Sequence, residues 1–243
     1  MYKILIVILK TLDNLKIISI HQPGYLPWLG FFKKIMYSDV FVFLDDAKFV
    51  KRQWHNRNQI RTGNGSTFLT VPIIAHSGEN INDVKISYDE KWNVNHRKTI
   101  LYSYNKTLFF EDYWNFFDEL YNKKIETLLE LNMKIIDFFI KELKIKTKTI
   151  FSSELGINKK KSDLNLEICK TLNADVYLSG IQGKNYLIED DFKKNEIEVR
   201  FQNFQHPIYQ QHYQPFIPNM AFIDLLFNEG KNSLEILQNS KNF

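Results

Sequence analysis

The sequence predicts an α/β fold in which a mostly parallel or mixed open sheet is flanked by helices, with a helical insertion in the middle of the chain. Strand and helix patterns alternate at both ends of the chain, as they do in βαβ units. Three helical patterns between residues 92 and 143 lack Gly and Pro. Two late apolar runs, Asp175–Ser179 and Ile197–Asn203, lie between helical segments, which is typical of parallel strands buried on both faces.

Strands are expected where short apolar runs end at turn residues. Before the two late runs, the expected strands are Lys16–His21, Asp39–Leu44, Asn56–Thr62, Thr67–Pro72, Val84–Ser87 and Thr147–Ser152. The third and fourth of these form a hairpin through Gly63-Asn64-Gly65, because that tripeptide is a strong turn signal. The fifth is a weaker candidate for an edge strand.

Helices are expected where apolar residues recur at spacings of three and four. The clearest case is Lys123–Leu143, whose apolar residues form one face, and Ser162–Leu172 begins with Ser at the N-cap position. A further helix begins near Trp28. The other expected helices are Trp92–Tyr104, Glu111–Tyr121, Ala221–Phe227 and Ser233–Leu237.

Length and composition are those of a globular protein. The chain has 243 residues, of which 44% are hydrophobic and 25% are charged. We expect residues 1–14 to be an extra segment and residues 15–243 to form a single α/β domain, with a helical block at about 92–143. The apolar run in the extra segment is too short to span a membrane and lacks a small-residue cleavage site, so no transmembrane segment is predicted.

The charge pattern favours a small anionic ligand over DNA. The formal net charge is +4, and the only tight basic run, Lys159-Lys160-Lys161, is typical of a solvated loop or a helix flank. A mild positive bias suits a nucleotide-sugar. Because Cys169 is the only cysteine, an intrachain disulfide and a multi-thiolate metal site are excluded. We predict a cytoplasmic location and no metal site.

The first candidate site is the loop from His21 to Phe32, between an expected strand and an expected helix. Open α/β sheets bind ligands outside the carboxyl ends of their strands. His21 can act there as an acid, as a base or as a hydrogen-bond donor to phosphate, or it can simply hydrogen-bond the loop backbone. The order of residues is similar to the first loop of nucleotidyltransferases, which carries His-x-Gly-His. Phe31 follows Gly30 where the second His is required, so that mechanism lacks a key residue.

The second candidate site begins with Asp45 and Asp46 at the end of the second expected strand. Paired carboxylates can bind a divalent cation, a ribose or an amine, or act as a base. Arginine side chains can bind phosphate oxygens through two hydrogen bonds, and asparagine amides can contact a sugar hydroxyl or a base edge. The stretch that follows supplies both kinds of residue and a lysine, namely Arg52, Arg57, Asn56, Asn58 and Lys51. The alternative is a solvated polar loop with local ion pairs.

Two later stretches can also carry chemistry. The run from Ser179 and Gly180 to Gly183 and Lys184 follows an expected buried strand and resembles a turn whose backbone amides hold a phosphate. It is too short for a P-loop, so a plain turn is the alternative. The segment from His206 to Pro218 contains Pro, His and Tyr residues and is typical of a rigid covering loop, in which His206 is catalytic or lines a pocket.

Together these stretches resemble the WbqC-like family, which is named from bacterial O-antigen gene clusters. The match runs from about Lys16 to about Leu237 and leaves residues 1–14 outside it. The Gly180-Ile181-Gln182-Gly183 turn departs from the family, where small residues are expected between the glycines. The motifs that carry the resemblance are His21 to Phe32, Phe43 to Asp46, Lys51 to Asn58, Leu69 to Pro72, Ser152 to Leu155, Tyr177 to Lys184 and Phe216 to Pro218.

The resemblance implies work on a surface-polysaccharide precursor, with an aminoacyl (glycyl) or acyl group transferred to the amine of a nucleotide-linked amino sugar. Either ATP would activate a free amino acid or other carboxylic acid, or an aminoacyl donor such as aminoacyl-tRNA would supply the group. The alternatives are nucleotidyl transfer or adenylate formation, and a non-catalytic protein that binds a nucleotide-sugar. The residues assigned to catalysis are His21, Asp45 and Asp46. Those assigned to substrate binding are Gln22, Tyr25, Trp28, Lys51, Arg52, Trp54, Asn56, Arg57, Asn58, Ser179, Gly180, Gly183, Lys184 and His206.

Overall fold

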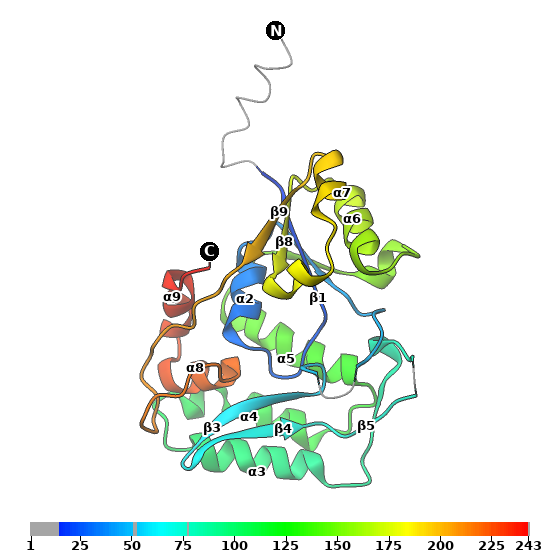
Figure 1. The fold of residues 1–243 in the computed structure, drawn as a ribbon. Coiled ribbons are helices and arrows are strands. Elements are labelled where there is room, and N and C mark those ends of the chain that lie inside the picture. The colour runs from blue at the N-terminus through cyan, green and yellow to red at the C-terminus, as the bar shows by residue number, and fades with distance from the viewer. Residues whose placement is uncertain (1–14, 51–52, 77, 243) are drawn as a thin grey trace.

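The computed structural model describes residues 15–50, 53–76 and 78–242, so the extra segment expected at residues 1–14 lies outside the described part of the chain. The structure contains a five-stranded parallel sheet, of which β1, β8 and β9 are labelled in the upper half of Figure 1. Its strand order is β7-β2-β1-β8-β9. The strands are β1 (Ile17–His21), β2 (Val40–Phe43), β7 (Lys148–Phe151), β8 (Val176–Gly180) and β9 (Glu198–Gln202). The predicted α/β class is therefore confirmed, and the predicted mostly parallel or mixed sheet is parallel throughout.

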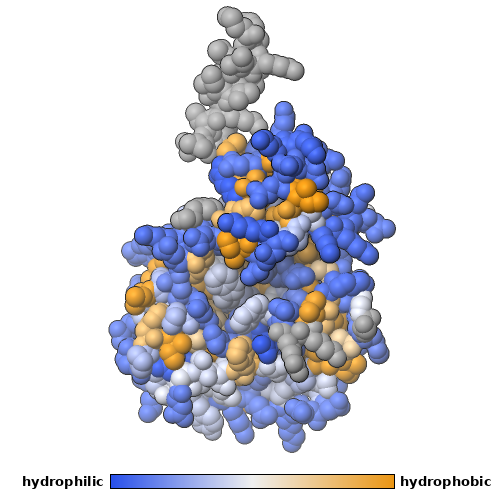
Figure 2. Space-filling model, in the orientation of Figure 1, coloured by the Kyte–Doolittle hydropathy of each residue, from blue (hydrophilic) through white to orange (hydrophobic). Residues whose placement is uncertain are grey.

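Helices cover both faces of this sheet. Alternate side chains of a strand point to opposite sides, so each face has its own apolar side chains to bury. Phe41 and Phe43 of β2 pack in a core with residues of α2 (Leu29–Met36), α5 (Leu128–Glu142) and α8 (Phe222–Glu229). Val40 and Val42 pack on the opposite side, against α6 (Lys161–Thr171) and α7 (Glu189–Lys194). The upper part of the molecule, where α6 and α7 lie, is mostly hydrophilic on the face shown in Figure 2. Both helices therefore bury one face and leave the other to solvent.

The order in which strands are added to the sheet reverses between β1 and β8, although the two strands are parallel. The chain builds β1, β2 and β7 outward on one side, then returns to place β8 and β9 on the other. Pairing of β1 with β2 continues to His21 and Phe43, whereas pairing of β1 with β8 ends at Ser19 and Leu178. The two halves of the sheet therefore part at the carboxyl ends of β1 and β8, where doubly wound sheets bind their ligands.

A helical block and a hairpin lie beyond this edge of the sheet (Figure 1). The block contains α3 (Trp92–Tyr104), α4 (Phe110–Asn122) and α5, and the hairpin joins β3 (Arg57–Thr62) to β4 (Gly65–Thr70). The other short elements are β5 (Ile73–Ile74), β6 (Lys85–Ile86), α9 (Asn232–Asn239) and the 3₁₀ turns η2 (Ile81–Asp83), η3 (Ser152–Leu155) and η4 (Ile181–Asn185). No helix in the described ranges is long and apolar enough to cross a membrane.

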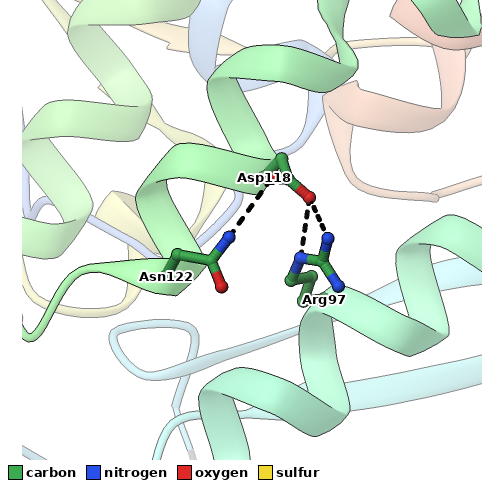
Figure 3. A network of polar contacts seen from close by, with 3 residues as sticks. All are labelled: Arg97, Asp118 and Asn122. Atoms are coloured by element: carbon green, nitrogen blue, oxygen red, sulfur yellow. Dashed lines mark hydrogen bonds and ion pairs between the residues drawn. The ribbon is translucent and has the colours of Figure 1, made fainter.

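An ion pair joins the first two helices of the block. Arg97 of α3 donates from Nε to Oδ1 of Asp118 on α4 at 2.7 Å, and its terminal Nη2 contacts the same oxygen. Asn122 donates to the other carboxylate oxygen of Asp118 at 3.1 Å (Figure 3). The guanidinium also lies over the ring of Trp114, 5.6 Å from its centroid. These contacts fix the angle at which α3 and α4 pack.

Several helix starts differ from the sequence expectation, and two of them bear on how the ends are capped. The helix expected from Lys123 begins at Leu128, because the Thr127 hydroxyl accepts a hydrogen bond from the Glu130 amide and caps it there. Ser162 does not cap its helix, which begins one residue earlier at Lys161. The Ser162 hydroxyl instead accepts a hydrogen bond from the Ile188 amide at 3.0 Å. Its partner lies 26 positions away, so local capping rules could not identify it.

A buried carboxylate joins α8 to the helical block and to the segment after β9. Asp224 is fully buried and accepts hydrogen bonds from the hydroxyl groups of Tyr104 and Tyr209 and from the amide of Gln211, at 2.6–2.9 Å. Burial raises the pKa of Asp224. The Tyr104 oxygen also accepts a hydrogen bond from the backbone amide of Arg61 in the hairpin. Tyr104 of α3 therefore links its helix to α8 and to the β3–β4 hairpin.

We predict that Tyr104→Phe lowers the free energy of unfolding by about 1–3 kcal/mol, because it leaves buried partners without their hydrogen bonds. Tyr102→Phe is the matched control, since Tyr102 lies on the same helix and is 69% exposed. Urea unfolding of both variants checks this. Equal midpoints for the two variants would contradict the role given to Tyr104.

Candidate functional site

A cavity of about 1290 Å³ lies at the parted carboxyl ends of β1 and β8. The strand ends supply His21, Ser179 and Gly180. The loop after β1 and the segment before β3 supply Trp28 and Trp54 on the other side. Further walls come from α2, from residues 44–48, from residues 157–165, from η4 and from the stretch after β9. The sheet therefore places its ligand-sized cavity where the strand order predicts one.

The described lining carries far more positive than negative charge. Its only carboxylate is that of Asp46. The lysines that line it are Lys34, Lys48, Lys159, Lys160 and Lys161. The last three form the run interpreted from sequence as a solvated flank, and they are exposed at the amino end of α6. Such a lining attracts an anionic ligand.

Aromatic rings provide flat surfaces in the same cavity. Trp28 contacts Phe204 edge-on at a centroid distance of 5.4 Å, and Trp54 is 54% exposed at the rim. A Cβ atom on Gly30 would lie 2.2 Å from the Trp28 ring, so the absence of a side chain at Gly30 gives the indole its place. A base or a sugar ring can pack against surfaces of this kind.

The imidazole of His21 is neutral and a weak base. Burial and the nearby charge of Lys34 lower the pKa of His21 to about 3. Its Nδ1 lies 2.8 Å from the carbonyl oxygen of Gln22. Because a carbonyl can only accept, Nδ1 carries the proton and Nε2 is left as an acceptor. The ring can therefore orient a donor of the substrate more readily than it can take a proton from it.

The two aspartates after β2 have different surroundings. Asp45 is buried and accepts hydrogen bonds from the hydroxyl group and the amide of Ser153, at 2.7 and 3.1 Å. It also shares the single hydroxyl proton of Ser152 with Asp46, at an oxygen–oxygen distance of 3.1 Å. These bonds tie the end of β2 to η3 after β7. Asp46 is half-buried and lines the cavity, with one hydrogen bond from Ser152 at 2.5 Å. Asp46 is therefore the carboxylate that a ligand can reach.

Polar side chains fix the first loop to the layers below it. His55 donates to the side-chain oxygen of Gln22 at 2.7 Å, and Asn58 donates to the Leu26 carbonyl at 2.6 Å. Leu26 has a φ of 44°, in the left-handed region that a branched side chain rarely adopts. Asn132 of α5 donates to the carbonyl groups of Pro23 and His55. The loop is thus held in a strained shape before any ligand arrives.

The other residues predicted to bind substrate fall into three groups. Ser179, Gly180 and Gly183 line the cavity with Gln22, Trp28, Trp54 and Asn58. Lys51 and Arg52 lie outside the described residues. The remaining five contact other parts of the protein and are absent from the cavity lining, namely Tyr25, Asn56, Arg57, Lys184 and His206.

Each of those five has a contact that accounts for its position. The Tyr25 hydroxyl is fully buried between His96 and Tyr121. Asn56 donates to the carbonyl of Val71 at 2.9 Å. Arg57 and Lys184 lie over the rings of Phe68 and Phe201, respectively. His206 lines a second cavity of about 670 Å³ beside α9. Among the described residues, no group of three His, Cys, Asp or Glu side chains could hold a metal ion.

Sequence reasoning missed several lining residues, of which Lys34 is the most informative. It lies three positions after Phe31 on α2, so it shares the apolar face that the helix turns inward. A lysine on the apolar face of a helix was the sequence signal that could have identified Lys34 as a site residue. Asn165 and Gln202 also line the cavity and follow no motif.

The chain belongs to the WbqC-like protein family, whose sequence model matches residues 22–236. It is similar to "Uncharacterized protein Rv1507c" of Mycobacterium tuberculosis, with 27% identity over 228 residues, which cover 92% of this chain and 98% of that protein. No solved structure matches the chain significantly. The family predicted from the motifs is therefore confirmed.

We predict that Asp45→Asn lowers the free energy of unfolding by about 1–3 kcal/mol, because it replaces an acceptor oxygen in a buried network. Asp46→Asn should change it by less than about 0.5 kcal/mol, since the amide oxygen can still accept from Ser152. Chemical unfolding of both variants tests this difference. A larger loss in Asp46→Asn than in Asp45→Asn would contradict the assignment.

Proposed function

We propose that the protein is a transferase that acts in the cytoplasm on a nucleotide-linked amino sugar of bacterial surface-polysaccharide (O-antigen) biosynthesis. It adds an aminoacyl group, such as glycyl, or an acyl group to the sugar amine. The observation that carries the proposal is the described cavity lining, which contains five lysines and one carboxylate, Asp46. The resemblance to a family named from O-antigen gene clusters supports the choice of substrate.

The lining offers a separate contact for each part of such a substrate. Lys48 and Lys159–Lys161 are exposed at the rim and attract the diphosphate. Trp28 and Trp54 offer surfaces on which the base and the sugar ring can pack. Nε2 of His21 can accept a hydrogen bond from the amine, because Nδ1 holds the ring proton.

Amide formation requires a group that takes a proton from the amine. The amine nitrogen forms a bond to the activated carboxyl carbon, and the bond from that carbon to its leaving group breaks. The leaving group departs with the electron pair, as AMP from an adenylate or as the ribose oxygen of an aminoacyl-tRNA, which becomes a hydroxyl by taking up the proton that the amine released. Asp46 accepts the amine proton, since it is the carboxylate that lines the cavity.

Adenylate formation is a second candidate, and the strand order favours it. The cavity lies where the strand order reverses, which is where doubly wound sheets bind nucleotides. ATP, like a nucleotide-sugar, carries a chain of linked phosphates on a nucleoside. This candidate predicts release of pyrophosphate from ATP when a carboxylic acid such as glycine is present, without a nucleotide-sugar. A non-catalytic protein that binds a nucleotide-sugar is a third possibility.

The direct test incubates the purified protein with a TDP-linked 4-amino sugar and either glycine with ATP or glycyl-tRNA. Mass spectrometry should detect a glycyl addition to the sugar nucleotide. Asp46→Asn should lower the transfer rate by about 100-fold or more, because the proton acceptor is lost. Asp190→Asn is the matched control, since Asp190 is an exposed carboxylate that does not line the cavity.

The outcomes separate the three candidates. If a panel of amino sugars and both donors give no added mass, the transfer proposal is contradicted. Pyrophosphate release without transfer would select adenylate formation. Tight binding of the sugar nucleotide, with Asp46→Asn changing affinity alone, would select a non-catalytic binding protein.

A further inference from the structure

Lys34 is a buried lysine whose charge has no counterion among the described residues. It is 1% exposed, although its side chain lines the cavity. Its ammonium donates one described hydrogen bond, to the carbonyl of Ile20 at 3.2 Å. The ring of Phe41 lies 5.9 Å from it. An ammonium can donate three hydrogen bonds and is costly to bury without an opposite charge.

The preceding residue, Lys33, shows how this helix satisfies a buried lysine that is structural. Lys33 is also 1% exposed, but its ammonium donates to the carbonyls of Leu237 and Gln238 at 2.7 and 2.6 Å. These carbonyls lie at the carboxyl end of α9, where the helix dipole favours a cation. Two adjacent lysines are therefore buried, and only one has a site built for its charge.

The ammonium of Lys34 lies where the two halves of the sheet part. Its acceptor, Ile20, is one residue beyond the last pair that joins β1 to β8. His21 is the next residue, and the charge of Lys34 lowers its pKa. The other titratable or charged side chains that line the cavity are Asp46, Lys48, Lys159, Lys160, Lys161, Tyr177 and Tyr186.

We propose that Lys34 forms the floor of an anion subsite, where its ammonium binds an oxygen of a nucleoside diphosphate. The inference rests on the nucleotide-linked substrate proposed above and assigns its diphosphate to the bottom of the cavity. The rim lysines attract the ligand from solvent, and Lys34 gains the opposite charge that the described residues do not supply. Neutral His21 adds no competing positive charge beside it.

The titration of Lys34 supplies a signature for this subsite. Burial lowers the pKa of Lys34 from its ordinary value of 10.5 to about 7. A bound anion favours the charged amine and raises that pKa again. Binding of a diphosphate above pH 7 therefore takes up a proton. The affinity should fall as the pH rises from 8 to 9, by up to about tenfold, a range well above the phosphate pKa of about 6.

The test is calorimetric titration of the full chain with thymidine diphosphate. Lys34→Met should weaken binding by about 10- to 100-fold, the range expected for a charge-assisted hydrogen bond. Lys33→Met is the matched control and should keep the affinity within about twofold, while its urea midpoint falls because the carbonyls of α9 lose their partner. At pH 6, the urea midpoint of Lys34→Met should exceed the wild-type value, since an uncompensated buried charge is removed.

Wild-type protein provides the second measurement, which needs no variant to fold. Titrations at pH 8 in buffers of different ionisation enthalpy should show proton uptake on binding, and Lys34→Met should take up less. Equal affinity and equal proton uptake in the two proteins would overturn the inference and leave the transfer proposal intact. Absence of diphosphate binding to wild-type protein would overturn both. Binding that depends on Lys34, with no transfer by any donor, would uphold the inference and contradict the transferase.

Discussion

The parting of β1 and β8 is the constraint on which the site depends. Their pairing ends at Ser19 and Leu178, while each strand continues beside its other neighbour. Because the strand order reverses at this point, the loops after β1 and β8 lead to opposite sides of the sheet. Neither loop covers the gap between the two strands. The gap therefore becomes the cavity, and the residues that end the two strands become its floor.

Electrostatics divides the polar residues near this gap into those that hold the structure and those left for a ligand. Asp45 is surrounded by donors from Ser152 and Ser153, whereas Asp46 keeps most of its capacity to accept hydrogen bonds. Lys33 is satisfied by the carboxyl end of α9, whereas Lys34 has one carbonyl. In each pair, the residue that the fold leaves incompletely satisfied lines the cavity. This supports a polar, anionic ligand.

The sequence was sufficient for the fold class, the hairpin and the edge of the sheet where the cavity lies. These follow from apolar runs, from Gly63-Asn64-Gly65 and from the polar loops that come after the expected strands. The sequence could not separate Asp45 from Asp46, since adjacent carboxylates differ only in contacts made by Ser152 and Ser153 more than a hundred positions away. It could not show that Asn58 holds the Leu26 carbonyl as well as lining the cavity. Contacts distant in sequence decide each of these roles.

The claim that the ligand binds between the parted ends of β1 and β8 is tested most directly by locating the residues at which a nucleoside diphosphate binds. Backbone amide NMR spectra recorded during titration with thymidine diphosphate report this residue by residue. The account predicts the largest shifts at Gln22, Ser179 and Gly180, at the parted ends of β1 and β8. Shifts gathered instead around Ile236 and the second cavity beside α9, or no shifts at all, would contradict it.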